Sequence, residues 1–553
     1  MSVEKLIVDH METWTSALQT RSTAGRGSSG KIDLYGIKKL RELILELAVR
    51  GKLVPQDPND EPASDLLKRI AAEKAELVKQ GKIKKQKPLP EISEEEKPFE
   101  LPEGWEWVHL PDIYCSISES SRKIKSSEIL PEGKYPVIEQ SQEFISGYCN
   151  NECLLIKLNN PVIVFGDHTR NIKFIDFDFV VGADGVKILS PILICERFFF
   201  WQLRSFKLDV RGYARHFKVL NSCLFALPPI AEQERIVEKV SSLMSLCDQL
   251  EQQSLTSLDA HQQLVETLLG TLTDSQNTAE LAENWARISE HFDTLFTTEA
   301  SVDALKQTIL QLAVMGKLVP QEPNDEPASE LLKRIAQEKA QLVKEGKIKK
   351  QKPLPPISDE EKPFELPEGW EWCRIGNIVN IKSELVSPKD YLNLYQVAPD
   401  IIEKGTGRVI SKRTVKESGV KGPNSRFYKG QIVYSKIRPS LSKVFLAEYN
   451  GLCSADMYPL DCYINPNYLL KYILSIPFLM QVKKAENRIK MPKLNSDSFY
   501  NIIVAIPPYN EQQAIFDKIN SIEAVCNGLI SYIGIYHKTQ LHLADALTDA
   551  AIN

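Results

Sequence analysis

A short polar segment in the first half of the chain gathers side chains suited to recognising nucleic-acid bases. GDHTRNIK, residues 166–173, lies between apolar runs within Pro161–Leu189, where the pattern predicts two or three strands with glycine-containing turns. Arginine can pair bidentately with guanine and asparagine with adenine, whereas lysine meets phosphate. The candidate contacts are His168, Thr169, Arg170, Asn171 and Lys173. The alternative is a polar hairpin that only turns the chain.

Three more basic clusters offer the same chemistry. The cluster that precedes the Pro-Pro dipeptide at 228–229 contains Arg211, Arg215 and Lys218. SKIRPSLSK, residues 435–443, follows a predicted strand and presents Lys436, Arg438, Ser440 and Lys443. ENRIKMPKLN, residues 486–495, precedes the second Pro-Pro and contains Arg488, Lys490 and Lys493. Basic residues before both Pro-Pro dipeptides predict a shared strip that contacts a phosphate backbone. A solvated surface is the alternative.

The chain lacks a convincing catalytic motif. IPPY at 506–509 resembles the (Asp/Asn)-Pro-Pro-(Tyr/Phe) motif of amino-methyltransferases, but Ile506 cannot hydrogen-bond a target amino group. No convincing glycine-rich AdoMet loop precedes it, and no G-x-x-x-x-G-K-[ST] phosphate loop is present. The Glu-x-Lys fragment at 132–134 has no obvious partner carboxylate. The ten cysteines are scattered without zinc spacing, so we expect reduced thiols and no metal site.

Composition and charge are those of an ordinary globular protein with one basic region. Hydrophobic residues make up 43% and charged residues 25% of the 553 residues. No apolar run approaches 20 residues, and MSVEKLIVDH lacks a secretory pattern, which predicts a cytoplasmic protein. The net charge is -5, but residues 373–505 carry roughly 20 Lys+Arg against 10 Asp+Glu. Residues 108–226 are close to neutral, so the remainder is acidic. The basic region suits phosphate binding.

One block of sequence occurs twice. LAVRGKLVPQ…KPFELPEGWEW (47–107) recurs at 312–372 with roughly 53 of about 61 positions identical. LPPIAEQERIVEKV (227–240) is matched by IPPYNEQQAIFDKI (506–519). The two regions enclosed by these repeats, 108–226 and 373–505, share only short fragments. The sequence therefore predicts a duplicated scaffold that carries two different heads.

The repeated blocks predict helices. Each begins with a helix, Leu40–Gly51 or Leu305–Gly316, whose glycine suits the position after a helix end. Ser64 and Ser329 are plausible N-caps of charged helices, and the basic GKIKKQKPLP that follows is a solvated linker or a phosphate-contacting tail. A helix should start after each Pro-Pro, and the first should extend over about 37 residues, roughly 55 Å. Their apolar 4-3 seam comprises Ile236, Val240, Leu243, Leu250, Ile515, Ile519, Ile522 and Leu529.

The arrangement of these motifs resembles the specificity (S) subunit of Type I restriction-modification enzymes. In that family, two different heads each open after a motif like LPEGWEW and close before PP-x-x-EQ, and repeated helices join them. FGDHTRNIKF and KIRPSLSK also look like segments of the family's target-recognition domains. The resemblance covers nearly the whole chain, although the helical insert around LLKRIAAEKAELVK is a feature of some branches only.

The resemblance implies an α+β protein in which two α/β target-recognition domains are separated by two conserved helical regions that form an antiparallel coiled coil. The expected domains are residues 1–107, 108–226, 227–372, 373–505 and 506–553. Each target-recognition domain would read one half of a bipartite, asymmetric target in double-stranded DNA. The coiled coil would set the unread spacer and dock partner subunits.

The resemblance also implies that this subunit does no chemistry and holds no cofactor. Two methyltransferase (M) subunits would bring AdoMet and N6-adenine methylation, and two restriction (R) subunits would bring ATP- and Mg-dependent translocation and cleavage in phage defence. The alternative is a coiled-coil scaffold whose heads bind protein, which the basic second head disfavours.

Overall fold

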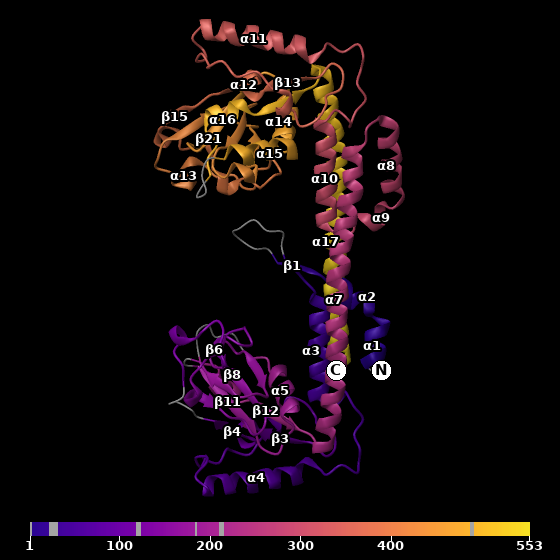
Figure 1. The fold of residues 1–553 in the computed structure, drawn as a ribbon, viewed down its shortest axis with the longest axis vertical. Helices are drawn as coiled ribbons and strands as arrows, with labels where there is room; N and C mark the ends of the chain where they lie inside the picture. Colours follow the sequence, from indigo (N-terminus) through magenta and orange to yellow (C-terminus); the bar gives the residue numbers. More distant parts are fainter. Residues whose placement is uncertain are drawn as a thin grey trace. The chain divides into compact units, whose positions relative to one another are not determined.

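Two long helices organise the chain. The computed structural model describes residues 3–21, 31–117, 123–182, 185–208, 215–486 and 492–552. Contacts divide the chain into two units, residues 1–257 with 535–553 and residues 258–534, each with a helical part and a sheet-rich head (Figure 1). The helices α7 (Ile230–Asp274) and α17 (Tyr509–Ile552) contribute to both units. With 45 and 44 residues, each spans about 67 Å, and α7 is longer than predicted.

In the first unit the two long helices run antiparallel beside α3 (Tyr35–Val49). Arg41 pairs with Asp248 (2.7 Å) and Glu251 (2.6 Å) of α7, while the Tyr35 hydroxyl donates to Asp545 of α17 (2.7 Å). Further along, Lys52 Nζ donates to the Ile552 carbonyl at the end of α17 (2.6 Å). The other elements here are α1 (Val3–Asp9), α2 (Met11–Ser16), α4 (Ala63–Lys79) and the pair β1 (Gln19–Arg21) and β2 (Lys31–Asp33).

The second unit repeats this arrangement with α10 (Glu299–Val314) in the place of α3. Lys317 Nζ donates to the carbonyls of Thr273 (2.8 Å) and Ser275 (2.9 Å) at the end of α7. Gln321 reaches Glu511 at the start of α17 (3.3 Å), so the long helices are antiparallel here too. The remaining helices are α8 (Thr278–Glu290), α9 (Phe292–Leu295) and α11 (Ala328–Lys344). No helix of the described ranges is long and apolar enough to span a membrane.

The predicted 4-3 seam lies inside the chain. Ile236, Val240, Leu243 and Leu250 of α7 are at most 6% exposed. In the second unit Ile515 and Ile519 belong to the core beneath the head, whereas Ile522 and Leu529 pack against Val265 and its neighbours on α7 and α10. The antiparallel helix pair is thus confirmed. The assignment to subunit docking is corrected for the six buried side chains, because they pack within the chain, whereas it stays a prediction for the half-buried Ile522 and Leu529.

The repeated glycines end their helices as predicted. Gly51 (φ +65°) follows α3, and its N–H and that of Lys52 bond back to the Ala48 and Leu47 carbonyls, an arrangement that closes the last turn. Gly316 (φ +71°) does the same after α10. The predicted N-caps are wrong: α4 and α11 begin two residues earlier than predicted, with Pro62 and Pro327 at the cap and no capping side chain.

The two heads share the topology of their principal sheet although their sequences differ. Their principal sheets have the orders β4-β11-β8-β9 and β14-β21-β18-β19. Beside these, β5 pairs in parallel with β10 in the first head, and β16 pairs in parallel with β20 in the second. Between Pro161 and Leu189 the chain forms four strands, one more than the upper prediction.

The first head comprises β3 (Glu106–His109), β4 (Tyr114–Ile117), β5 (Tyr135–Ile138), β6 (Gly147–Cys149), β7 (Leu155–Ile156), β8 (Val162–Gly166), β9 (Ile172–Ile175), β10 (Phe179–Val181), β11 (Val186–Pro191), α5 (Glu196–Ser205), α6 (Phe217–Leu220) and β12 (Leu224–Leu227). The second comprises β13 (Glu371–Arg374), α12 (Ile375–Ile378), β14 (Val379–Ile381), β15 (Glu384–Val386), β16 (Tyr395–Val397), α13 (Val415–Ser418), β17 (Asn424–Phe427), β18 (Ile432–Ser435), β19 (Val444–Leu446), β20 (Gly451–Ser454), β21 (Met457–Cys462), α14 (Pro466–Ile473), α15 (Ile476–Ala485), α16 (Ser496–Asn501) and β22 (Ile503–Ile506).

A buried polar junction joins each head to its long helix. At the start of α7, Glu232 accepts hydrogen bonds from Trp105 Nε1 (2.9 Å) and Gln56 (3.1 Å). The next residue, Gln233, accepts from the Cys195 N–H at the start of α5 (2.9 Å) and donates to the Pro228 carbonyl. The repeated LPEGWEW and Glu-Gln motifs therefore meet in space, and the Gln extends the contact into the head.

The second junction has the same geometry. Glu511 accepts from Trp370 Nε1 (2.9 Å) and Gln321 (3.3 Å), and Gln512 accepts from the Asn465 N–H at the start of α14 (2.9 Å). Both carboxyl groups are nearly inaccessible, and burial raises the pKa of Glu232 and of Glu511 while the two donated hydrogen bonds lower it.

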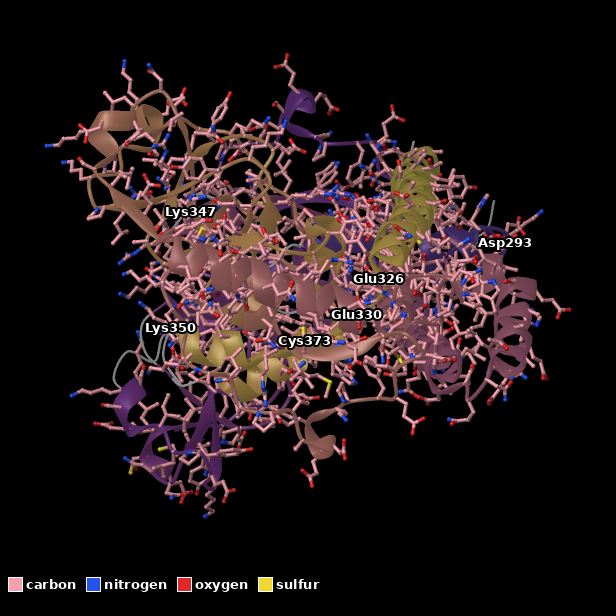
Figure 2. The ribbon with its side chains drawn as sticks, turned by 90° about the horizontal axis from the view of Figure 1, so that it is seen from above. Asp293, Glu326, Glu330, Lys347, Lys350 and Cys373 are labelled. Carbon is pink, nitrogen blue, oxygen red and sulfur yellow. The ribbon has the colours of Figure 1, made fainter. Side chains whose placement is uncertain are left out.

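One lysine of each charged helix, α4 and α11, hydrogen-bonds to the adjacent head. Lys339 Nζ donates to the Gly376 (2.6 Å) and Val379 (2.9 Å) carbonyls, and burial lowers its pKa to about 8. In the first head, Lys74 Nζ donates to the Pro111 carbonyl (2.5 Å). Charge along α11 suits the helix dipole, since Glu326 and Glu330 lie near its start and Lys347 and Lys350 beyond its end (Figure 2).

Substituting Gly51 by Ala should destabilise the chain more than the same change at Gly81. Both glycines have a positive φ, which costs an alanine about 1 kcal/mol. A Cβ at Gly51 would also lie 2.4 Å from Pro102 Cγ, whereas nothing among the described residues lies within 4 Å of one at Gly81. Thermal unfolding of the two full-length variants measures the difference, and equal shifts in midpoint would contradict it.

Trp105→Phe should lower the free energy of unfolding by about 1–3 kcal/mol, because it removes a donor from a buried carboxylate. Trp107→Phe is the matched control, since that indole is only half-buried and donates over 3.3 Å to the Phe99 carbonyl. Chemical denaturation of both variants tests this expectation. A loss at Trp107 as large as that at Trp105 would show that ring packing, not the hydrogen bond, holds the junction.

Candidate nucleic-acid interface

Equivalent hairpins carry the predicted polar turns of the two heads. GDHTRNIK connects β8 to β9, and KIRPSLSK connects β18 to β19. Each turn holds an arginine with left-handed backbone, Arg170 (φ +62°) and Arg438 (φ +46°), and Ser442 shares this conformation (φ +46°). Among the described residues other than glycine, only Leu193 is a further case. Such backbone is disfavoured for these residue types and concentrates at functional sites.

In the first head most predicted contacts bond to the chain itself. The Gln140 carbonyl accepts from the Thr169 hydroxyl (2.5 Å) and the Asn171 amide (2.9 Å), and the Gln140 side chain accepts from the His168 N–H (3.2 Å). Arg170 donates through one nitrogen to the Leu208 carbonyl (2.7 Å).

Lys173 is the most deeply buried of the predicted contacts in this turn. It is 6% exposed, and its ammonium donates to the carbonyls of Glu139 (2.8 Å), Glu143 (2.5 Å) and Phe144 (3.4 Å). Burial lowers the pKa of this amine, an effect that the nearby carboxylates oppose. We correct its assignment to phosphate contact on this ground.

The second basic cluster of the first head lies against the same turn. The carbonyl of Asp167 accepts from the His216 N–H (2.8 Å), and its carboxylate accepts from the Phe217 N–H (2.8 Å). Arg215 and Lys218 are exposed beside this contact. Arg211 lies outside the described residues. Two clusters that are about 45 residues apart in sequence thus meet at one edge of the head.

The second head brings its two clusters together in the same way. Ile437 and Lys493 form an isolated antiparallel bridge, and the Arg438 N–H donates to the Pro492 carbonyl (2.9 Å). The Arg438 side chain is exposed, and the Ser440 N–H donates to Glu486 (3.0 Å). Arg488 and Lys490 lie outside the described residues.

Three lysines of these clusters have partners within the second head. Lys436 donates to the Ala455 carbonyl (2.8 Å), and Lys493 pairs with Asp456 (3.2 Å). The half-buried Lys443 ammonium donates to the Pro399 carbonyl, and its assignment to phosphate contact stays a prediction at this point.

A basic loop that lies next to this turn was not predicted from the sequence. The segment between β16 and β17 reaches the turn, where the Gly405 N–H donates to the Ser442 carbonyl (3.4 Å). Its exposed cations are Lys404, Arg408, Lys412, Lys416 and Lys421. The excess positive charge of this region signalled its presence, but only folding shows that it adjoins the hairpin.

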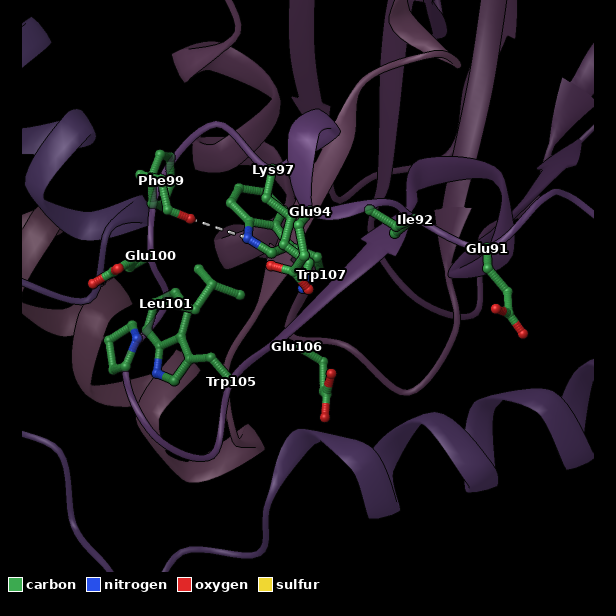
Figure 3. A pocket seen from close by; sticks show the side chains of 11 residues that line it. Glu91, Ile92, Glu94, Lys97, Phe99, Glu100, Leu101, Trp105, Glu106 and Trp107 are labelled. Carbon is green, nitrogen blue, oxygen red and sulfur yellow. Dashed lines mark hydrogen bonds and ion pairs between the residues drawn. The ribbon is translucent and has the colours of Figure 1, made fainter.

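The pocket beside the first Trp-Glu junction is unsuited to a phosphate. It is about 830 Å³ in volume, and its lining includes the carboxylates of Glu91, Glu94, Glu100 and Glu106 (Figure 3). The ten cysteines are free, and no cluster of metal-ligating side chains occurs within the ranges that the structure describes.

Comparison with known proteins agrees with the shared topology of the heads. A family model for the Type I restriction modification DNA specificity domain matches residues 102–260 and 367–533, one match for each head and its following helix. The chain belongs to this family of specificity subunits. The predicted family and the prediction of a subunit that does no catalysis are therefore confirmed.

Two relatives from Escherichia coli match along the whole chain, and a third matches most of it. The specificity subunit of Type I restriction enzyme EcoAI is 51% identical over 609 residues, and that of EcoEI is 48% identical over 606 residues, each covering 100% of both chains. The EcoDI specificity subunit is 28% identical over 77% of this chain and 82% of its own length.

Arg438→Ala should weaken target discrimination by about 1–3 kcal/mol, the contribution of one bidentate contact to a base, and should leave stability unchanged because the side chain is exposed. Lys333→Ala, on the exposed face of α11, removes one charge elsewhere and is the control. Competition binding of target and mismatched duplexes by the assembled complex measures the effect. Equal losses for both duplexes would make Arg438 a phosphate contact instead.

Proposed function

We propose that this specificity subunit reads a bipartite, asymmetric sequence in double-stranded DNA, one half with each head. The observation that supports this most directly is the pair of equivalent hairpins with different side chains. GDHTRNIK and KIRPSLSK occupy the same place in one topology, so each head presents different groups to the same kind of surface. Unlike readers on like supports would give unlike half-sites.

The contacts proposed for reading are those that the fold leaves accessible. In the first head they are Arg170, through the donors that Leu208 does not use, with Arg215 and Lys218. In the second they are Arg438 for bases and Lys404 and Arg408 for phosphates. The second head is the more basic, so we expect it to supply more of the salt-dependent affinity.

We further propose that the subunit docks two M subunits and two R subunits. Block 47–107 and its copy at 312–372 keep roughly 53 of about 61 positions, including the exposed KIKKQK segments. Exposed positions are the least constrained by folding, so their retention favours one kind of partner bound twice. Exposed apolar residues of α17, Val525 and Tyr532, lie seven residues apart and offer a second surface.

The cofactors are proposed to belong to those partners. AdoMet would be held by the M subunits and ATP with Mg by the R subunits, while this chain would hold none. We place the complex in the cytoplasm, where it would meet phage DNA.

Replacing residues 373–505 by the corresponding head of another specificity subunit should change one half of the methylated sequence and keep the spacer, since the junction at Glu511 and Gln512 is retained. Methylome sequencing of a host that carries the exchanged gene measures this. The parental gene in the same host is the control. A change in both halves would contradict the division of the target between the heads.

A further inference from the structure

Two lysines in the heads make the same kind of contact although the sequences around them differ, Lys173 as a buried residue and Lys443 as a half-buried one. Lys173 is the second residue of β9, and Lys443 immediately precedes β19, so each opens the returning strand of its hairpin. Each ammonium donates to the main chain of the loop that follows the neighbouring parallel strand, Lys173 to three carbonyls and Lys443 to one. For Lys173 these belong to Glu139, Glu143 and Phe144 after β5, and for Lys443 to Pro399 after β16.

The loops that receive these lysines also contact the turns. Gln140, next to Glu139, bonds to His168, Thr169 and Asn171. In the second head Gly405, six residues after Pro399, bonds to Ser442. Each hairpin turn is thus fastened to the same loop at two points, by its lysine and by a main-chain or glutamine contact.

From this geometry we propose that Lys173 and Lys443 are positioning residues that hold the reading turns in shape and do not contact phosphate. Arg170 and Arg438 adopt left-handed backbone, which is disfavoured for residues other than glycine and persists only where the surroundings impose it. A lysine whose ammonium is bonded to main-chain carbonyls supplies such a constraint and directs its charge to the loop, away from DNA. The proposal rests on the proposed function of the heads as readers.

The test compares lysines bonded to carbonyls with exposed lysines of the same head, in the assembled complex with its M subunits. Lys173→Met and Lys443→Met remove the ammonium donor and keep most of the length of the side chain. Lys218→Met and Lys404→Met remove the same charge from exposed positions. Affinity is measured against salt concentration, with the methylated target, with duplexes altered in one half-site, and with unrelated duplex.

For Lys173→Met we expect the log–log salt slope to stay at the wild-type value. Affinity for the target should fall about tenfold, through lost discrimination in the first half-site alone, with unrelated DNA bound as before. Lys443→Met should do the same for the second half-site. Lys218→Met and Lys404→Met should each lower the slope by about 0.9 and weaken target and unrelated DNA alike.

A slope lowered by about 0.9 in Lys173→Met or Lys443→Met, with target and unrelated DNA weakened equally, would overturn the proposal and make that lysine a phosphate contact. Lost discrimination in both half-sites from one substitution would also overturn it, because the effect would then not belong to one turn. A wild-type complex that methylates no bipartite sequence would instead refute the proposed function.

Discussion

The rest of the structure depends on a carboxylate buried against an indole. Glu232 and Glu511 lose their hydration where the long helices begin, and each is compensated by a tryptophan N–H and a glutamine amide. A buried carboxylate left with one partner is costly, so both motifs must be present together. This explains why LPEGWEW and the Glu-Gln pair are each repeated, although they lie about 125 to 140 residues apart in the chain.

The glutamine beside each carboxylate allows the same junction to bind heads of different sequence. Gln233 and Gln512 bind a backbone N–H at the start of a helix, from Cys195 in one head and Asn465 in the other. A main-chain contact places no demand on the side chain at that position. The scaffold can therefore carry heads of unrelated sequence, provided that a helix begins at that point.

Spacing and residue type predicted the repeats, the long helices, the helix-ending glycines and the hairpins, because these depend on local preferences and on apolar periodicity. Spacing and residue type did not predict the hydrogen-bond partners of polar groups when those partners lie far away in the sequence. Lys173 and Lys443 look like phosphate ligands in sequence, yet the ammonium group of each donates to the main chain of a loop that follows another strand. The seam around Ile236 and Ile515 looked like a docking surface because periodicity shows that a face is buried but not what buries it.

If the two junctions are equivalent, the heads should be interchangeable within the chain. The most direct measurement is the methylome of a host whose specificity subunit carries residues 373–505 in place of 108–226 and residues 108–226 in place of 373–505. Exchange between equivalent positions is predicted to leave the same duplex target, read from the opposite strand, with the same spacer. A folded, active complex that methylates a different sequence would contradict the account.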